Sequence, residues 1–433
     1  MNTRLRPLPL ALAAVLALAA CAPSAPPPAR ASKSETAWRF RLGTGAAPSG
    51  WTKVSASTKY EAGTGFGFEA TGGIAQVDHG AGFLTADRPF YFSVALPEGN
   101  YRVAVTLGDS GGGSDTTVKA ELRRLMLAGV ATERGEIVRR EFIVNIRRPS
   151  ISDGAEGVVA LKPREQKEEW RAWDGKLTLE FGGARPCVSA IEIEPAGRVP
   201  TVFLLGDSTV CDQPREPYAS WGQMLTVFLG PSVAIANHAE SGESYHGALA
   251  ARRLAKVLSV ARPGDTVLMQ YGHNDMKVVD VPGYKTSIKS FVDAFRAKKI
   301  SVVLVTPPHR RTFDKDGRIT NSHKGYPDAV REVAREEKIP LIDLLEMTRA
   351  FYEAMGPDAS EVAFKPGDRT HHNAYGAYEL AKCVAEGIRA ARLPLAKHIT
   401  AALPRFDPAH PDAPGSVKIP PSATSPGDTP DGS

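Results

Sequence analysis

The stretch Thr201-Val-Phe-Leu-Leu-Gly206-Asp207-Ser208-Thr209-Val210 decides the fold of the second half of this 433-residue chain. Its apolar run follows Pro200 and stops at Gly206, a pattern typical of a short strand that is buried on both faces. Such strands belong to open α/β sheets, in which the carboxyl ends of the strands face a crevice. We therefore expect Ser208 to lie in a turn at that edge, where rigid backbone holds its hydroxyl within reach of a substrate.

The segment 198–403 continues this pattern, because strand and helix signals alternate along it. We expect strands at 201–205, 232–236, 266–271, 301–306 and 341–344, and helices at 220–229, 247–260, 283–298, 326–337 and 375–392. The predicted fold class is a three-layer α/β/α domain around a parallel sheet. The tail 404–433 is rich in proline, and we expect it to be disordered past residue 415.

The segment 36–197 differs, because short runs of alternating apolar and polar residues are separated there by Gly, Asp and Ser clusters. This pattern predicts an all-β sandwich whose sheets each have one buried and one solvated face. The segment resembles galactose-binding-like jelly rolls, and we interpret it as an accessory domain. Its pattern leaves open whether it binds sugar, positions a substrate or braces the α/β domain. Arg123 and Arg124 are expected to form a solvated charge pair.

The sandwich segment also contains a second Gly-Asp-Ser string, Gly108-Asp109-Ser110, after an apolar strand. Three glycines follow it and oppose the helix start that a nucleophile turn usually needs. Ser110 is therefore not expected to be a nucleophile.

The first 20 residues carry Arg4 and Arg6 before an apolar run from Leu8 to Ala20, which is the layout of a signal peptide and too short to span a membrane. Leu18-Ala19-Ala20-Cys21 resembles the lipobox of bacterial lipoproteins, which implies lipidation of Cys21; secretion after an Ala-x-Ala site is the alternative. Residues 21–35 are rich in proline and alanine and predict an extended tether. Both interpretations predict an exported protein, and lipidation predicts an anchor on a bacterial membrane, facing the periplasm or the cell surface.

Composition excludes several classes of function. The formal net charge of +5 falls short of the basic face of a nucleic-acid-binding protein, and no motif for one is present. The four cysteines show no metal-ligand spacing, and beyond Cys21 they allow at most one disulfide. We expect no cofactor and no metal, and the pattern does not indicate an oligomeric state.

Three further blocks of polar residues follow strands or precede the last helix, as Ser208 does. They are the loop 237–244 with Gly242, Gly272-His273-Asn274-Asp275, and Asp368-Arg369-Thr370-His371. The four blocks, in this order, resemble those of the SGNH (GDSL-type) hydrolase superfamily. Stretches such as Ser220-Trp-Gly-Gln-Met-Leu225 and Asp368-x-Thr-His-His-Asn-x-Tyr-Gly-Ala377 are most similar to rhamnogalacturonan acetylesterases.

This resemblance implies a carbohydrate esterase that works through an acetyl-enzyme. A serine hydroxyl is a poor nucleophile at neutral pH, so a histidine must accept its proton, and His371 is the expected base. Asp368 is expected to fold back and orient the imidazole. By resemblance, the oxyanion hole consists of the backbone N–H groups of Ser208 and Gly242 and the side-chain amide of Asn274. The structural alternatives are a turn glycine at 242 and a loop-capping amide at 274.

The substrate is less strongly indicated. His309, Arg310, Arg311 and Lys324 cluster after the fourth strand, and guanidinium groups suit the carboxylates of galacturonic acid; a solvated basic loop is the alternative. His372 is a further candidate for substrate binding or for a structural role. The family resemblance favours acetylated pectin, specifically rhamnogalacturonan. An esterase for another glycan such as xylan, and a non-catalytic carbohydrate-binding protein, are the other interpretations.

Overall fold

Two β-sheets form the first half of the described chain, which comprises residues 1, 37–70, 72–80, 82–151, 157–401 and 403–423 of a computed structural model. The first sheet has the order β10-β7-β12-β1-β2; β5 also pairs with β12, and β4 pairs with β5. Its strands are β1 Trp38–Leu42, β2 Thr52–Val54, β4 Ile74–Val77, β5 Phe83–Ala86, β7 Gly99–Gly108, β10 Ile137–Ile146 and β12 Val188–Pro195. The second sheet has the order β3-β6-β11-β8-β9, with β3 Phe66–Phe68, β6 Phe90–Ala95, β8 Ser114–Ala120, β9 Arg124–Thr132 and β11 Lys176–Arg185.

The two sheets share one apolar core, to which Val105 and Ile191 contribute from the first sheet and Phe92 and Leu179 from the second. The alternation of apolar and polar residues therefore produced two packed sheets, as predicted. The jelly-roll connection of their strands stays a prediction.

The second half contains a five-stranded parallel sheet of order β14-β13-β15-β16-β17, as the sequence predicted. Its strands are β13 Thr201–Gly206, β14 Ala234–Asn237, β15 Thr266–Gln270, β16 Ser301–Val305 and β17 Leu341–Ile342. Val202 and Leu204 of β13 point into one core, whereas Phe203 and Leu205 point into the other. The apolar run is continuous because both faces of this strand are covered.

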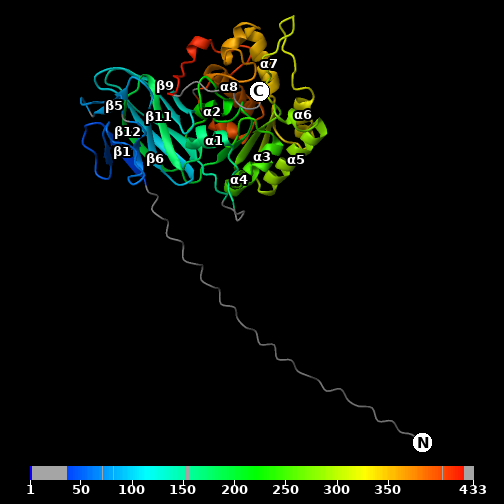
Figure 1. Cartoon of the computed structure of the whole chain (residues 1–433), viewed down its shortest axis with the longest axis horizontal. Helices are drawn as coiled ribbons and strands as arrows, with labels where there is room; N and C mark the ends of the chain where they lie inside the picture. Colours follow the sequence, from blue (N-terminus) through cyan, green and yellow to red (C-terminus); the bar gives the residue numbers. More distant parts are fainter. Residues whose placement is uncertain (2–36, 71, 81, 152–156, 402, 424–433) are drawn as a thin grey trace. The chain divides into compact units, whose positions relative to one another are not determined.

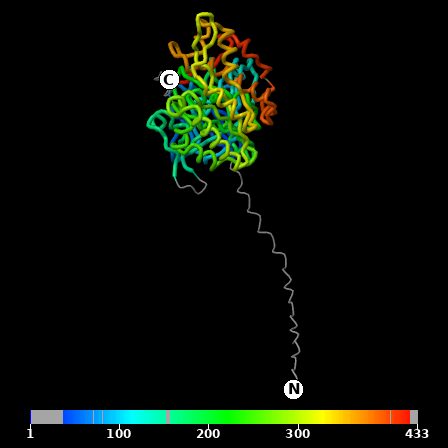
Figure 2. The backbone as a smooth tube through the Cα atoms, turned by 90° about the vertical axis from the view of Figure 1, so that its right-hand side faces the viewer, coloured from blue at the N-terminus to red at the C-terminus, as the bar shows by residue number. Residues whose placement is uncertain are grey.

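Helices cover both faces of this sheet (Figure 1). One face carries α2 Trp221–Leu225, α7 Leu344–Met355 and α8 Ala374–Ala390; the other carries α3 Tyr245–Ala250, α4 Arg253–Val260, α5 Val281–Ala297 and α6 Tyr326–Glu336. The helix expected at 247–260 is divided in two, because Arg252 adopts a left-handed backbone with φ of 63°. With the molecule turned by 90°, the green and yellow segments of this domain face the viewer (Figure 2).

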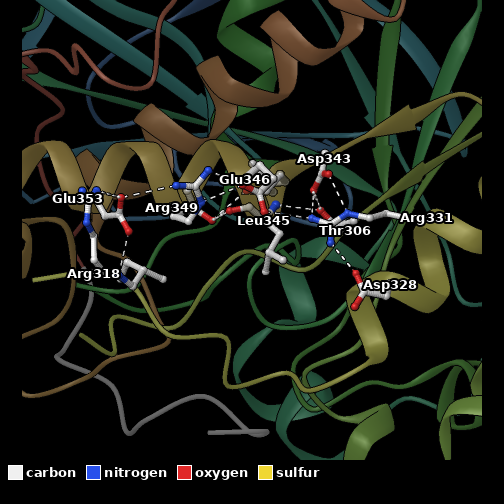
Figure 3. Close-up of polar contacts among 12 residues, drawn as sticks. Thr306, Arg318, Asp328, Arg331, Asp343, Leu345, Glu346, Arg349 and Glu353 are labelled. Carbon is white, nitrogen blue, oxygen red and sulfur yellow. Dashed lines mark hydrogen bonds and ion pairs between the residues drawn. The ribbon is translucent and has the colours of Figure 1, made fainter. Parts of the chain in front are cut away.

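Helix α7 has no counterpart among the expected elements. Its start is fixed by a polar network in which Arg331 of α6 bonds Asp343, with Nε to Oδ2 at 2.9 Å, and the N–H of Leu345 donates to Thr306 Oγ1 at 2.8 Å (Figure 3). Thr306 directly follows β16, so this network also fixes the start of the loop that carries Arg310.

Arg123 and Arg124 correct one expectation, because both are buried where the sandwich meets the α/β domain. Arg124 Nε donates to Asp212 Oδ2 at 2.8 Å, and Arg123 Nη1 donates to the carbonyls of Gln213 and Tyr218 at 3.0 and 2.8 Å. The prediction of a solvated pair was wrong because the compensating groups come from the other domain. Nothing in the local sequence marks them.

The tail differs from expectation over residues 416–423, where disorder was expected but Val417, Ile419 and Ser422 contact the domains. Ser422 is buried; its hydroxyl donates to Glu180 Oε2 and accepts from Lys119 Nζ, both at 2.8 Å. Proline-rich composition indicates only that a segment forms no core of its own, and here the sandwich supplies the partners. Residues 424–433 lie outside the described part.

Cys187, Cys211 and Cys383 are free and buried, so no disulfide forms within the described residues. In that same part of the chain no helix is both long and apolar enough to cross a bilayer. The signal peptide, the tether and Cys21 lie outside the described residues.

Candidate active site

Ser208 lies in a tight turn at the carboxyl end of β13. The N–H groups of Val210 and Cys211 both donate to the carbonyl of Asp207, each at 3.0 Å, and the Asp207 carboxylate accepts the N–H of Thr209 at 3.0 Å. A side chain at Gly206 would bring its Cβ to 2.5 Å from the carbonyl oxygen of Gln270. The glycine and the aspartate of the Gly-Asp-Ser string are thus needed to form the turn that presents the serine.

The structure brings Ser208, His371 and Asp368 together. Ser208 Oγ lies 2.8 Å from His371 Nε2, and His371 Nδ1 lies 3.0 Å from Asp368 Oδ2. The second oxygen of Asp368 accepts the N–H groups of Thr370 and His371 at 2.7 and 3.0 Å, so the carboxylate folds back over its own turn. With the imidazole proton on Nδ1, Nε2 is the atom able to accept the serine proton.

The Asp368 carboxyl is held in its ionised form. Burial raises its pKa, but the hydrogen bond and the charge of His371 and the backbone N–H groups outweigh burial, so the pKa lies well below its ordinary value. An ionised Asp368 is the state that stabilises an imidazolium at His371.

The expected oxyanion donors lie on loops that are tied to the serine turn. Gln213 Nε2 donates to the carbonyl of Ser208 at 2.7 Å and lies 3.4 Å from Ser241 Oγ. Gly242 has a left-handed φ of 71°, which favours glycine. Asn274 Nδ2 donates to the carbonyl of Glu243 at 3.0 Å, and this bond engages one of its two amide hydrogens.

Asp275 fixes the loop of Asn274. Its two carboxylate oxygens accept the N–H groups of Tyr245 at 2.9 Å and Gly272 at 3.0 Å. Burial raises its pKa to about 7, which fits a bracing group. These two hydrogen bonds of Asp275 hold the loop in the conformation that positions the side-chain amide of Asn274.

Among the expected substrate-binding residues, Arg310 has a partly buried guanidinium group close to the charges of the serine site. Its buried Nε and Nη2 make no hydrogen bond to any described residue. Burial lowers the pKa of its guanidinium, and the charges of Asp207 and Asp368 act in the opposite direction. Since these two carboxylates flank Ser208 and His371, the Arg310 guanidinium is coupled to the same site.

Of the two roles expected for His372, substrate binding or a structural role, its contacts fit the structural one. Its Nε2 lies 2.7 Å from the hydroxyl of Tyr352, its ring centroid lies 4.5 Å from that of Phe364, and burial lowers its pKa to about 3. Its ring is therefore engaged by the core.

Arg311 and His309 are held by the protein through other atoms, although Arg311 Nε and His309 Nδ1 also lack a hydrogen-bond partner among the described residues. Arg311 Nη1 donates to the carbonyl of Pro357 at 2.9 Å, and Nη2 lies 3.8 Å from Glu361, so this side chain braces the segment before Asp368. His309 is 3% exposed, and burial lowers its pKa to about 4. Lys324 is exposed, as a solvated loop residue would be.

Two residues near the site were not expected from the sequence. Tyr218 places its ring edge to face with His371, with 6.0 Å between the ring centroids, and Gln213 links the two loops described above. Both lie in the loop after the serine, where no motif marks a role for them. Their proximity to His371 and to Ser208 is evident only from the structure.

The second Gly-Asp-Ser string has a different geometry. Ser110 Oγ lies 3.2 Å from His79 Nδ1, but the same nitrogen lies 3.3 Å from Asp109 Oδ1. A serine relay needs the nucleophile and the carboxylate on opposite ring nitrogens. This arrangement does not provide one.

Comparison with known proteins places the chain among esterases. Residues 204–378 match the family model described as GDSL-like Lipase/Acylhydrolase family, and residues 38–133 match one described as beta-agarase/YXIM esterase-like, galactose-binding domain-like. The chain is 40% identical over 216 residues to the rhamnogalacturonan acetylesterase RhgT of Bacillus subtilis (strain 168), over 46% of this chain and 93% of that protein.

Two further similarities extend over both domains. The uncharacterized esterase YxiM of the same Bacillus strain is 28% identical over 378 residues, which cover 81% of this chain and 90% of that protein. A crystal structure of the YxiM protein of Bacillus subtilis aligns with a TM-score of 0.47 and 24% identity, covering 83% of this chain and 99% of that one.

Replacing Asp368 with asparagine tests the ionised carboxylate. A group whose pKa is depressed in the folded state stabilises the fold above its unfolded pKa of about 4, and this contribution is lost as the pH falls through the folded pKa. We expect Asp368→Asn to melt at a lower temperature than the wild type at neutral pH, and the difference to shrink as the pH falls below about 4. Melting curves by circular dichroism measure it, and a pH-independent difference would contradict the assignment.

Proposed function

The chain belongs to the GDSL-like lipase/acylhydrolase family, and on that premise we propose that it is a serine esterase that removes O-acetyl groups from acetylated rhamnogalacturonan. The observation that carries the proposal is the array in which Ser208 Oγ lies 2.8 Å from His371 Nε2 and His371 Nδ1 lies 3.0 Å from Asp368 Oδ2. This arrangement provides a nucleophile, a base and an orienting carboxylate.

In the first half-reaction, Ser208 Oγ attacks the acetyl carbonyl carbon while His371 Nε2 accepts its proton. The N–H groups of Ser208 and Gly242 and the Asn274 amide donate to the oxyanion, each contributing about 3 kcal/mol. The C–O bond to the sugar then breaks, and the imidazolium returns the proton to the departing sugar oxygen. Water repeats the sequence on the acetyl-enzyme, with His371 as base, and releases acetate.

The choice of an acidic glycan is supported by Arg310. Its two buried N–H-bearing nitrogens without a described partner suit a carboxylate, which a guanidinium binds through paired hydrogen bonds. Acetylated xylan is predominantly neutral and offers far fewer such groups. The RhgT relative, named a rhamnogalacturonan acetylesterase, points to the same substrate class.

We also propose export and a lipid anchor at Cys21, which rest on the sequence alone. Mass spectrometry of the mature amino terminus tests this proposal. An unmodified terminus on a wholly soluble protein would refute the anchor.

The proposed substrate is tested by measuring acetate released from acetylated rhamnogalacturonan and from acetylated xylan. We expect faster release from rhamnogalacturonan and, for Ser208→Ala, a loss of at least about 10³-fold on both. A preference for xylan would remove the pectin assignment. Equal and negligible release by the wild type and the variant, on these glycans and on an aryl acetate, would indicate a binding protein without turnover.

Arg310→Met tests recognition of the carboxylate. Because the substitution removes a charge-assisted pair of hydrogen bonds, we expect KM on the acidic polymer to rise about tenfold or more. KM on a neutral aryl acetate should stay close to that of the wild type. Arg318→Met is the matched control, since the Arg318 side chain is 72% exposed. Equal effects of Arg310→Met on both substrates would contradict a role in specificity.

A further inference from the structure

We propose that Lys162, a residue of the N-terminal domain, positions and polarises the peptide group whose N–H belongs to Gly242 in the oxyanion hole. This inference rests on the proposed function and assigns the N-terminal domain a part in catalysis. Lys162 is a positioning residue, because it acts through the backbone of the 240–243 loop.

Lys162 lies just before helix α1 (Pro163–Glu168), in the connection between β10 and β11 of the sandwich. It therefore lies outside both matched family regions, 38–133 and 204–378. No sequence motif of the esterase domain contains it. Its relation to the site arises only from the packing of α1 against the α/β domain.

The contact that carries the inference is a hydrogen bond from Lys162 Nζ to the carbonyl oxygen of Ser241, at 2.5 Å. The carbonyl of Ser241 and the N–H of Gly242 belong to one planar trans peptide, so they point in opposite directions. A group that holds the carbonyl therefore also sets the direction of the N–H. This peptide precedes a left-handed residue, with φ of 71° at Gly242, so its orientation is specific to this loop.

The charge of Lys162 adds to this effect. A cation on the carbonyl oxygen polarises the peptide, and hydrogen-bonded groups in a poorly solvated site strengthen one another. The N–H of Gly242 becomes a better donor to an oxyanion. Because that negative charge develops only in the transition state, the stronger hydrogen bond raises kcat and leaves substrate binding unchanged.

A buried ionic network fixes Lys162 against the loop. The N–H of Lys162 donates to Glu165 Oε2 at 2.9 Å, and the same oxygen accepts Arg253 Nη2 at 2.5 Å. Arg253 Nε in turn donates to Glu243 Oε2 at 2.9 Å, so helix α1, through Glu165, and the 240–243 loop share one arginine. The side chains of Arg253 and Glu165 are each 1% exposed. Well-oriented buried pairs of this kind favour one arrangement over others.

Three carboxylates, Glu165, Glu169 and Glu240, come together in this network. Arg253 neutralises Glu165, and Arg164 Nη2 donates to Glu169 Oε1 at 2.8 Å. We interpret the cluster as the anchor of α1 on the loop that contains Gly242.

The first test is steady-state kinetics of Lys162→Met on an aryl acetate. We expect kcat to fall about tenfold with little change in KM, since only a transition-state interaction is weakened. Lys162→Arg, which keeps a charged donor, should recover part of the loss. Lys167→Met is the matched control, because Lys167 is an exposed lysine of α1 and should behave as the wild type.

The second test separates positioning from a general loss of structure. A boronic acid forms a tetrahedral adduct on the serine, and its oxygen occupies the oxyanion hole. In Lys162→Met its Ki should rise by the same factor as kcat/KM falls, while partial unfolding would lower the active fraction and leave Ki unchanged. If Lys162→Met fails to fold, Lys162→Gln keeps a neutral donor and should show the same parallel change in smaller degree.

Wild-type kcat and Ki in a folded Lys162→Met would overturn the inference while leaving the esterase intact. A wild-type protein no more active than Ser208→Ala would instead refute the proposed function. The two failures are therefore distinguishable.

Discussion

The hydrogen bond between Ser208 Oγ and His371 Nε2 is the interaction on which the site depends, and it joins residues 163 positions apart. One partner lies in the turn after β13, an internal strand of the parallel sheet, and the other precedes α8, which packs on one face of the same sheet. A bond of 2.8 Å between such distant segments requires both the strand and the helix to be placed accurately. The two apolar cores on either side of β13 provide this placement.

Buried charge then couples the site to the N-terminal domain. Arg124 of the sandwich bonds Asp212, whose second oxygen accepts the side chain of Asn237 at the end of β14. Arg253 and Lys162 form a second connection, on the loop that contains Gly242. Removing one partner of such a pair would leave an uncompensated buried charge, so both partners are needed where the two domains meet. The sandwich thus contacts the loops of the esterase domain through buried charged side chains.

The features predicted correctly from the sequence were those that depend on local hydrophobic pattern and on the order of the motifs. The continuous apolar run of β13 indicated a strand covered on both faces, and the motif blocks indicated which loops would meet at its end. The contacts of Arg124, Ser422 and Lys162 could not be predicted. A charged or proline-rich stretch has the composition of a solvated segment, and its partners lie far away in the sequence. The adjacent histidines were told apart by the spacing from Asp368: His371 faces Ser208, and His372, for which a structural role was left open, packs on Phe364.

Trapping the acyl-enzyme shows whether Ser208 is the nucleophile. The wild-type protein is mixed with an aryl acetate, quenched in acid during turnover, digested and analysed by peptide mass spectrometry. We expect one acetyl group on the peptide that contains Ser208, and its absence in Ser208→Ala. An acetyl group on the peptide of Ser110, or turnover by Ser208→Ala at the wild-type rate, would contradict this expectation.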